Sequence, residues 1–181
     1  MMDPQLHQRA AKIRLLLMDV DGVLTNGLLF NVPAQEGQMI ETKGFNAQDG
    51  IALQWLRWSG IQTGVISGRE SHALEVRAKQ VGMTYVYQGH IEKAPILEEI
   101  IQRSGFSLEE IAYAGDDLTD VPILRRAGLA LAPANARPEV KRCAHHVTAV
   151  PGGEGAVREI AEILLQAQGH WDGLLKKYEV V

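Results

Sequence analysis

The chain has 181 residues, of which 46% are hydrophobic and 22% are charged, and its formal net charge at pH 7 is −4. This composition fits one globular domain with a core of ordinary size, and it argues against disorder. The negative net charge leaves no surplus of basic residues to neutralise a phosphate backbone, so we expect no nucleic acid partner. The single cysteine excludes an intrachain disulfide and is typical of a reducing cytoplasm. The polar N-terminus predicts no signal peptide and no apolar run approaches the roughly 20 residues that span a bilayer, so we expect a cytoplasmic protein with no membrane contact.

The N-terminal third contains a predicted helix, a buried strand and a hairpin. Asp3 followed by Pro4 predicts the start of a leading helix, because the carboxylate can cap free amides and proline tolerates the first helical position. The apolar run 13–18 predicts a strand that is buried on both faces. Two short strands predict a β-hairpin over about residues 27–42. The hairpin strands are expected at 27–31 and 38–42, with turn residues Pro33, Glu36 and Gly37.

From residue 44 onward the pattern alternates between helix and strand. Helices are expected at 49–59, 70–81, 93–103, 118–126, 136–141 and 155–167, and strands at 61–66, 84–87, 111–114, 129–131 and 145–147. Such alternation is typical of a parallel sheet covered by helices. The sequence therefore predicts an α/β fold, a doubly wound (Rossmann-like) parallel sheet with helices on both faces plus the small hairpin, in a single domain over 1–181. For the tail, residues 169–181, the pattern predicts no definite element.

Polar side chains follow the predicted strands at the points where they end. Asp19 and Asp21 come directly after the first strand, Ser67 follows the strand 61–66, and Asp116 follows the strand 111–114. Lys93 begins the helix after another strand. In an open parallel sheet, ligands bind beyond the carboxyl ends of the strands. We therefore expect these side chains to face one crevice.

This set of residue types is suited to phosphoryl transfer. Clustered carboxylates repel each other unless a hard cation binds them, and Mg²⁺, usually held by one or two carboxylates and a phosphate, fits Asp19 and Asp116. Asp19 can then attack a phosphate ester to give an aspartyl-phosphate, while Ser67 and Lys93 bind the phosphoryl oxygens. Asp21 is placed to protonate the leaving alcohol and then to deprotonate the attacking water. The sequence predicts a magnesium-dependent phosphatase.

Each of these residues also has an ordinary structural interpretation. Ser67 before a glycine fits a helix cap, and an isolated lysine such as Lys93 usually lies on the surface. Asp117 is interpreted as an acid at a helix N-terminus, and the role of Asp120 stays open. The conjunction of four such features at strand ends, in this order, favours catalysis.

Four other residues stand outside the cluster. His145 and His146 have no spaced carboxylate partner, and we interpret them as structural. Trp55 and Trp58 fit either the core or a subunit contact.

Four segments resemble the motifs of the haloacid dehalogenase superfamily of phosphatases: DVDGVLT at 19–25, VISGR at 65–69, Lys93 and GDDLTD at 115–120. The resemblance implies the same roles for the five strand-end residues, and it adds the backbone carbonyl of Asp21 as a metal ligand. The intervals between the motifs leave no room for the separate cap domain of most members. A capless enzyme has an open site unless another subunit covers it, so the resemblance implies an oligomer.

A narrower resemblance covers nearly the whole chain, through GFNAQDG at 44–50, Arg69, Arg77, YQG at 87–89 and GGEGAVREI at 152–160. These segments are similar to the family of 3-deoxy-D-manno-octulosonate (KDO) 8-phosphate phosphatases of lipopolysaccharide synthesis. This narrower resemblance implies a homotetramer in which the hairpins form a shared barrel and neighbouring subunits close each site. It implies substrate contacts from Asp21, Lys93, Asn46, Gln48, Asp49, Gly50, and Arg69 or Arg77 for the sugar carboxylate.

The substrate has alternatives. Gln48 and Gln54 stand where relatives carry basic residues, and Glu154 stands where they carry arginine or histidine. Glutamate at that place is typical of phosphatases for 2-keto-3-deoxynononate 9-phosphate, but those carry glutamate where this chain has Arg69. Arg69 therefore favours the eight-carbon substrate.

Two noncatalytic classes share some of these features. A receiver domain carries its phosphorylated aspartate after the third strand with no acid two residues later, which does not match Asp21. A noncatalytic oligomeric partner of a sugar nucleotide synthetase is free to lose a catalytic residue, and this chain has lost none.

Overall fold

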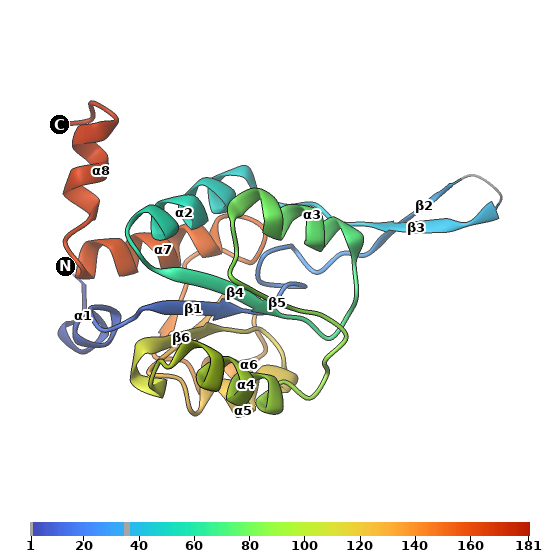
Figure 1. Cartoon of the computed structure of the whole chain (residues 1–181), viewed down its shortest axis with the longest axis horizontal. Coiled ribbons are helices and arrows are strands. Elements are labelled where there is room, and N and C mark those ends of the chain that lie inside the picture. Colours follow the sequence, from blue (N-terminus) through green and yellow to red (C-terminus); the bar gives the residue numbers. More distant parts are fainter. Residues whose placement is uncertain (1, 35–36) are drawn as a thin grey trace.

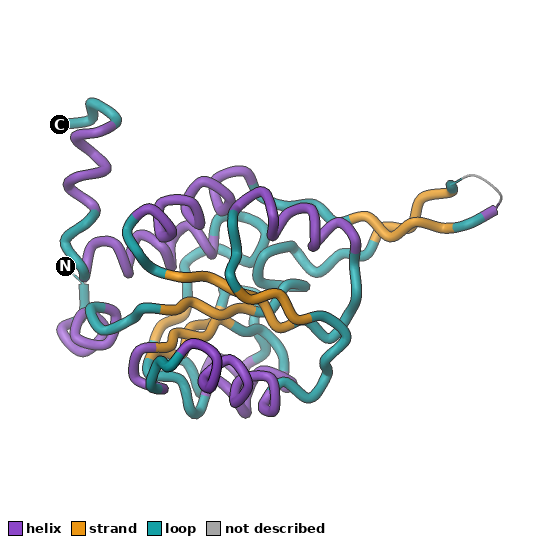
Figure 2. The backbone as a smooth tube through the Cα atoms, in the orientation of Figure 1, coloured by secondary structure: helices purple, strands orange, loops and turns teal. Residues whose placement is uncertain are grey.

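The computed structural model describes residues 2–34 and 37–181, and a parallel sheet lies at its centre (Figures 1 and 2). Within the described residues six strands lie in the order β5-β4-β1-β6-β7-β8, and neighbouring strands are parallel. The strands are β1 Leu15–Met18, β4 Gln62–Ile66, β5 Tyr85–Tyr87, β6 Ile111–Ala114, β7 Leu129–Ala132 and β8 His146–Val147. The chain winds outward from β1 in both directions, so the predicted doubly wound α/β sheet is confirmed.

Helices cover both faces of this sheet (Figure 1). One face carries α2 Ala47–Trp58, α3 His72–Val81 and α7 Ala156–Ala167, and the other carries α4 Ala94–Ser104, α5 Val121–Leu124 and α6 Pro138–Lys141. The side chains of β1 alternate between two cores, with Leu16 and Met18 in the core under α2 and α7, and Leu15 and Leu17 in the core on the other face. Burial on both faces explains why this segment is apolar throughout.

The shorter elements refine the predicted boundaries. The leading helix is confirmed as α1 Pro4–Ala10, with the Asp3 side chain accepting hydrogen bonds from two amides of its first turn. A 3₁₀ turn, η2 Leu108–Glu110, precedes β6. The single helix predicted over 118–126 is wrong, because it divides into a 3₁₀ turn, η3 Leu118–Asp120, and α5. Pro122 lacks the amide hydrogen that would continue the first turn and stands instead near the start of a new helix.

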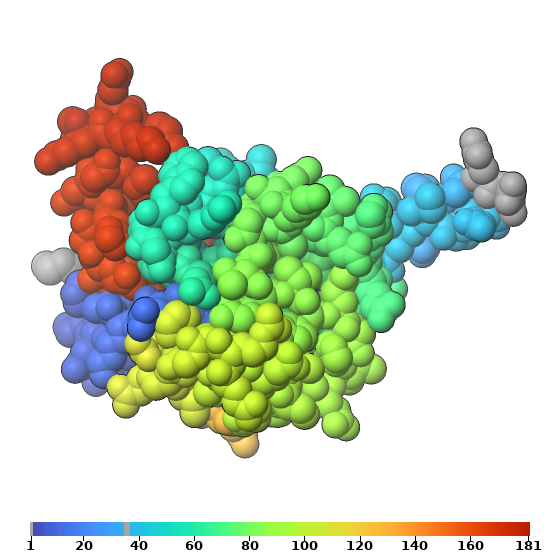
Figure 3. Space-filling view, viewed as in Figure 1, coloured from blue at the N-terminus to red at the C-terminus, as the bar shows by residue number. Residues whose placement is uncertain are grey.

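A two-stranded antiparallel hairpin, β2 Phe30–Pro33 and β3 Met39–Thr42, projects from the body (Figures 1 and 3). Its first strand begins three residues later than predicted, because the Asn26 side chain accepts the Leu28 amide and holds the preceding segment in a turn. Pro33, predicted in the turn, ends β2, while the predicted turn residue Glu36 lies outside the described residues.

The C-terminal tail forms a helix that the sequence pattern did not predict, α8 Trp171–Lys177. It is held by an aromatic cluster in which the Trp55 ring packs edge-on against Trp171, and its indole N–H donates to the Tyr178 hydroxyl over 3.1 Å. Trp55 is therefore buried, whereas Trp58 is 53% exposed. None of the described helices combines the length and hydropathy needed to cross a membrane.

Candidate active site

Asp19 lies at the carboxyl end of β1, in the middle of the sheet. Its amide donates to the Ala114 carbonyl of β6 over 2.9 Å, which carries the strand pairing one residue past β1. The chain then turns sharply, with the amides of Leu24 and Thr25 donating to the Val20 carbonyl. Asp19 is 9% exposed. The sheet thus presents one carboxylate at a fixed, nearly buried point.

Gly22 allows this turn to approach the loop after β6. Its φ of +94° lies in the region that favours glycine, and a Cβ there would stand 2.2 Å from Asp116 Oδ2. The Asn135 side chain ties the same turn to a further loop, because its Nδ2 donates to the Gly22 carbonyl and its Oδ1 accepts from the Gly152 amide. The sequence pattern gave no indication of Asn135.

Asp120 is the buried support of this site. Its Oδ2 accepts from the amides of Asp116 and Asp117 over 3.0 and 3.1 Å, and its Oδ1 accepts from Lys93 Nζ at 2.6 Å and the Tyr113 hydroxyl at 2.7 Å. These bonds fix the loop that carries Asp116. Asp117 caps η3 by accepting the Leu118 amide, as its predicted role at a helix N-terminus requires.

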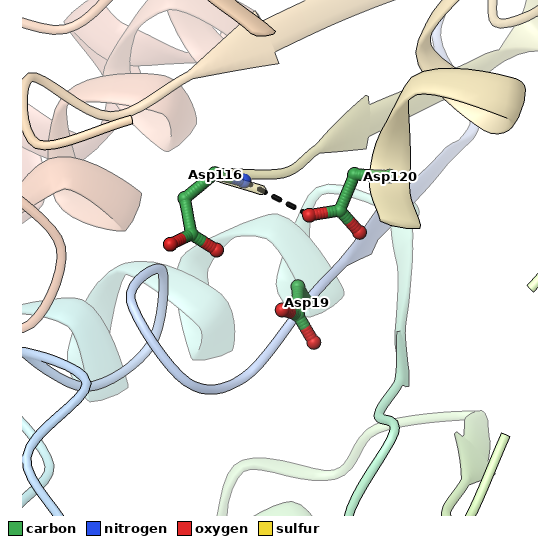
Figure 4. Close-up of side chains that lie close together, drawn as sticks. All are labelled: Asp19, Asp116 and Asp120. Atoms are coloured by element: carbon green, nitrogen blue, oxygen red, sulfur yellow. Dashed lines mark hydrogen bonds between the residues drawn. The ribbon is translucent and has the colours of Figure 1, made fainter. Parts of the chain in front are cut away.

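Three carboxylates are close enough to share a cation. Asp19, Asp116 and Asp120 each offer an oxygen within 4.8 Å of the others (Figure 4). Asp116 Oδ1 is buried, and no described residue donates a hydrogen bond to it, whereas both Asp120 oxygens are already engaged. A buried oxygen without a donor fits a cation ligand. Asp19 and Asp116 therefore fit a divalent metal ion, and Asp120 supports them.

Lys93 supplies the positive charge of the cluster. It is 3% exposed, and its Nζ lies 2.9 Å from Asp19 Oδ1 and 2.6 Å from Asp120 Oδ1. Burial lowers the pKa of Lys93, but the charges of these two carboxylates raise it by more, so the net shift is upward and the ammonium stays charged. The ordinary interpretation of Lys93 as a surface lysine is wrong.

The pKa values of the two metal-ligand candidates are raised. Burial raises the pKa of Asp19 to about 6, against the opposing charge of Lys93. Burial, and next the charge of Asp19, raises the pKa of Asp116 to about 7. A bound divalent cation would stabilise both ionised carboxylates, because its charge offsets the cost of their burial and their mutual repulsion.

Ser67 directly follows β4, the strand that lies beside β1, and is 2% exposed. Its hydroxyl donates to the Arg69 carbonyl over 2.9 Å and accepts from the Arg69 amide over 3.2 Å. Arg69 itself is half-exposed, pairs with Glu41, and places its Nε 3.9 Å from Asp21 Oδ2. Arg69 thus connects the loop after β4 with Asp21 in the loop after β1.

Arg77 has a partner within the fold. Its Nη2 donates to the Asn46 carbonyl over 2.9 Å, and a Cβ on Gly50 would stand 2.0 Å from that nitrogen. Asn46 caps α2 by accepting the Gln48 amide. Arg77 therefore holds the first turn of α2, and Arg69 is the more exposed of the two arginines.

Asp49 is 1% exposed, and its Oδ1 accepts the Arg158 amide of α7 over 2.7 Å. Burial raises the pKa of Asp49. This contact joins α2 to α7, and among the predicted substrate residues of the same turn Gln48 is exposed and Gly50 is buried. Their contacts with substrate stay a prediction.

Two further residues differ from the sequence expectations. His146, expected to have no carboxylate partner, lies 3.0 Å from Glu159 of α7, because the return of the chain brings the helix beside β8. His145 accepts a hydrogen bond from the Ala130 amide, which fits its structural role.

Lys43, which the sequence pattern did not single out, is 8% exposed and lies 2.5 Å from Asp21 Oδ1.

Comparison with known proteins identifies the family of this chain. The model of the haloacid dehalogenase-like hydrolase family matches residues 66–160. The KDO 8-phosphate phosphatase of Yersinia pestis is 42% identical over 166 residues, which are 92% of this chain and 87% of that protein. The chain belongs to the haloacid dehalogenase-like hydrolase family. The corresponding phosphatase of Escherichia coli K12 is 39% identical over 91% of this chain and 85% of that protein.

Solved structures of this hydrolase family superpose closely. The KDO 8-phosphate phosphatase of Moraxella catarrhalis, in complex with magnesium, phosphate and KDO, has a TM-score of 0.91 and 36% identity, covering 98% of this chain and 99% of that chain. The cobalt-bound phosphatase of Haemophilus influenzae has a TM-score of 0.82 and 36% identity, covering 90% and 92%.

Metal binding at this site can be tested by stability. Because the folded-state pKa values of Asp19 and Asp116 lie above the unfolded value of about 3.9, the folded hydrolase binds more protons between about pH 4 and pH 7, and its metal-free stability falls as pH rises through that range. Protons compete with the cation, so we expect Mg²⁺ to raise Tm more at about pH 8.5 than at about pH 5.5. At a Mg²⁺ concentration of about a hundred times Kd, binding raises the free energy of unfolding by about 2.7 kcal/mol. Differential scanning fluorimetry measures the shift.

The Asp116→Asn variant is expected to lose the Mg²⁺-dependent shift, while Asp117→Asn, at an exposed neighbouring carboxylate, keeps it. A shift that is the same at both pH values, or that survives in Asp116→Asn, contradicts the assignment.

The approach of Gly22 to Asp116 gives a second prediction. Gly22→Ala is expected to lower the free energy of unfolding by about 1–3 kcal/mol through its φ of +94° and to abolish the Mg²⁺ shift by displacing Asp116. Gly60→Ala is the matched control, because Gly60 has a φ of +83° with no described atom within 4 Å of its Cβ position. It shares the strain but keeps the Mg²⁺ shift. Chemical denaturation and calorimetry measure both, and a Gly22→Ala protein with unchanged Mg²⁺ binding rules out the close approach.

Proposed function

We propose that this hydrolase is a Mg²⁺-dependent phosphatase that converts KDO 8-phosphate into the free sugar acid and phosphate through an aspartyl-phosphate, as a cytoplasmic step of lipopolysaccharide precursor synthesis. The observation that carries the proposal is the nearly buried Asp19 beside the Lys93 ammonium and beside Asp116 Oδ1, which accepts no hydrogen bond from any described residue. The relatives named above support the substrate, since they carry this activity in their names and one was solved with magnesium, phosphate and KDO.

The residues divide the reaction into two steps. Asp19 attacks phosphorus, the bond from phosphorus to the sugar oxygen breaks, and that oxygen takes its electron pair and the proton of Asp21. In the second step Asp21 takes a proton from water, the water oxygen attacks phosphorus, and the bond to Asp19 breaks with its pair returning to the carboxylate. Lys93 and Ser67 bind the phosphoryl oxygens as negative charge develops on them. Mg²⁺, held by Asp19, Asp116 and the Asp21 carbonyl, would reduce the repulsion between the carboxylates and the phosphoryl group.

Arg69 is the residue proposed to bind the sugar carboxylate. Its guanidinium is half-exposed and close to Asp21, and guanidinium groups bind carboxylates with paired hydrogen bonds. Asn46, Gln48, Asp49 and Gly50 are proposed for the sugar hydroxyls. The exposed Glu154 keeps the nine-carbon 2-keto-3-deoxynononate 9-phosphate as the alternative substrate, and a noncatalytic partner of a sugar nucleotide synthetase remains the noncatalytic alternative.

Phosphate release tests the activity directly. With Mg²⁺ we expect kcat/KM for the eight-carbon acid phosphate to exceed those for the nine-carbon acid phosphate, hexose phosphates and nucleoside monophosphates by at least about tenfold, or roughly 1.4 kcal/mol of transition-state binding. Asp19→Asn lacks the nucleophile and is expected to lose on the order of 10³-fold or more, which excludes contaminating phosphatases. Equal rates on all substrates would remove the named substrate, and no release from any would leave the noncatalytic role.

We further propose that the chain forms a homotetramer through its hairpins. The β2–β3 register places Phe30, Val32 and Ile40 on one face of the hairpin, where they are 50%, 45% and 55% exposed. An isolated two-stranded hairpin with an apolar face is marginally stable in water, so this face is suited to packing against copies of itself.

Light scattering with size-exclusion chromatography tests the assembly. We expect four times the chain mass of 19.9 kDa for the wild type and a smaller species for Val32→Asp with Ile40→Asp, because the charges would be buried between subunits. Val76→Asp, at a residue of 43% exposure on α3, serves as control and is expected to keep the tetramer. A monomeric wild type contradicts the proposal.

A further inference from the structure

Lys43 joins the base of the hairpin to the loop that follows β1. It is the first residue after β3, and its side chain is 1% exposed although its neighbours Thr42 and Gly44 are exposed. Its Nζ lies 2.5 Å from Asp21 Oδ1 and 3.2 Å from Glu41 Oε1. The contact therefore connects two segments that are separated by the whole hairpin.

A buried ammonium needs a reason to be retained. Taking an unpaired charge out of water is unfavourable, and an apolar residue at the same place would avoid that cost. Lys43 is paired with two carboxylates, and Glu41 pairs in turn with Arg69, whose Nε lies 3.9 Å from Asp21 Oδ2. Two basic and two acidic side chains thus form a closed ring, and Asp21 is the member that belongs to the loop after β1, two residues after Asp19.

We infer that Lys43 is a positioning residue for Asp21, an inference that rests on the proposed phosphatase function. The ammonium holds Oδ1, which leaves Oδ2 as the oxygen for proton transfer to the substrate. When the bond from phosphorus to the sugar oxygen breaks, that oxygen keeps the electron pair and takes the Asp21 proton, and this transfer needs the carboxyl group within hydrogen-bond reach. Lys43 itself transfers no proton and touches no reacting atom.

Glu41 gives the arrangement its second anchor. It belongs to β3 and contacts Lys43 on one side and Arg69 on the other. Glu41 of β3 therefore holds Lys43, and Lys43, the residue directly after β3, holds Asp21.

A substrate with a different bridging atom distinguishes a loss of proton transfer from Asp21 from a general loss of activity. The test compares kcat/KM for the sugar acid 8-phosphate with kcat/KM for its phosphorothiolate, in which sulfur replaces the bridging oxygen, because a thiolate leaves without a proton. For Lys43→Met we expect the oxygen-to-sulfur ratio of kcat/KM to fall at least about tenfold, within the range that general acid catalysis contributes. Lys43→Arg keeps the charge and is expected to lie between wild type and Lys43→Met. Asp21→Asn provides the benchmark for a lost acid.

The ratio is independent of the fraction of folded enzyme, because unfolding lowers both rates equally. Lys12→Met, at an exposed lysine paired with Glu109, is the matched control and is expected to keep the wild-type ratio. If Lys43→Met does not fold, Glu41→Gln replaces it and is expected to lower the ratio at least about threefold, since it releases Lys43 from the hairpin side.

The outcomes separate the two hypotheses. An unchanged ratio in Lys43→Met, or in Glu41→Gln where that variant replaces it, overturns the positioning role even if both rates fall. A wild-type protein that releases nothing from the oxygen ester overturns the proposed function, and the inference with it.

Discussion

The buried ion pairs of Lys93 are the interaction on which the active site depends. One ammonium lies between Asp19 and Asp120, and a third carboxylate, Asp116, stands within the same cluster. Three carboxylates against one ammonium leave two negative charges when all are ionised. Burial is the main cause of the raised pKa values of Asp19 and Asp116, and the neighbouring carboxylates add to it. A divalent cation has the charge that the cluster lacks, which explains why a protein would keep so costly an arrangement in its interior.

The loops around this cluster are shaped by close backbone approach. Gly22 brings the first loop against Asp116, and Gly152 brings the loop before α7 against the first loop, where a Cβ would stand 1.9 Å from the Gly22 carbonyl oxygen. Asn135 joins the two. The ends of β1 and β6 fix the positions of Asp19 and Asp116 along the edge of the sheet, and Gly22 and Gly152 let the loops approach each other closely. Backbone geometry therefore defines the site before any ligand binds.

The sequence predicts the sheet and the polar residues at its edge because both leave local patterns. β1 is apolar throughout since it is buried on both faces. Asp19 and Ser67 stand directly after strands, and Asp116 stands two residues after β6. Asp120 and Lys43 leave no such pattern, because what distinguishes them is burial beside partners elsewhere in the chain. The helix α8 leaves no local pattern for the same reason, since it is held by contacts of Trp171, and of Tyr178 directly after it, with Trp55 of α2.

Side chains alternate between the two faces of the hairpin, so its two faces can make different contacts. Phe30, Val32 and Ile40 share one face, while Glu41, next to Ile40, points to the other and reaches Lys43 and Arg69. Apolar contacts on the first face fix the hairpin only if a partner covers it, whereas the ionic contacts on the second face fix it against the loop after β1. If copies of the chain associate through the apolar face, the same packing that forms the oligomer also restrains Glu41 and Lys43. Assembly and the position of Asp21 are then linked by a single strand, because β3 cannot shift at one face without shifting at the other.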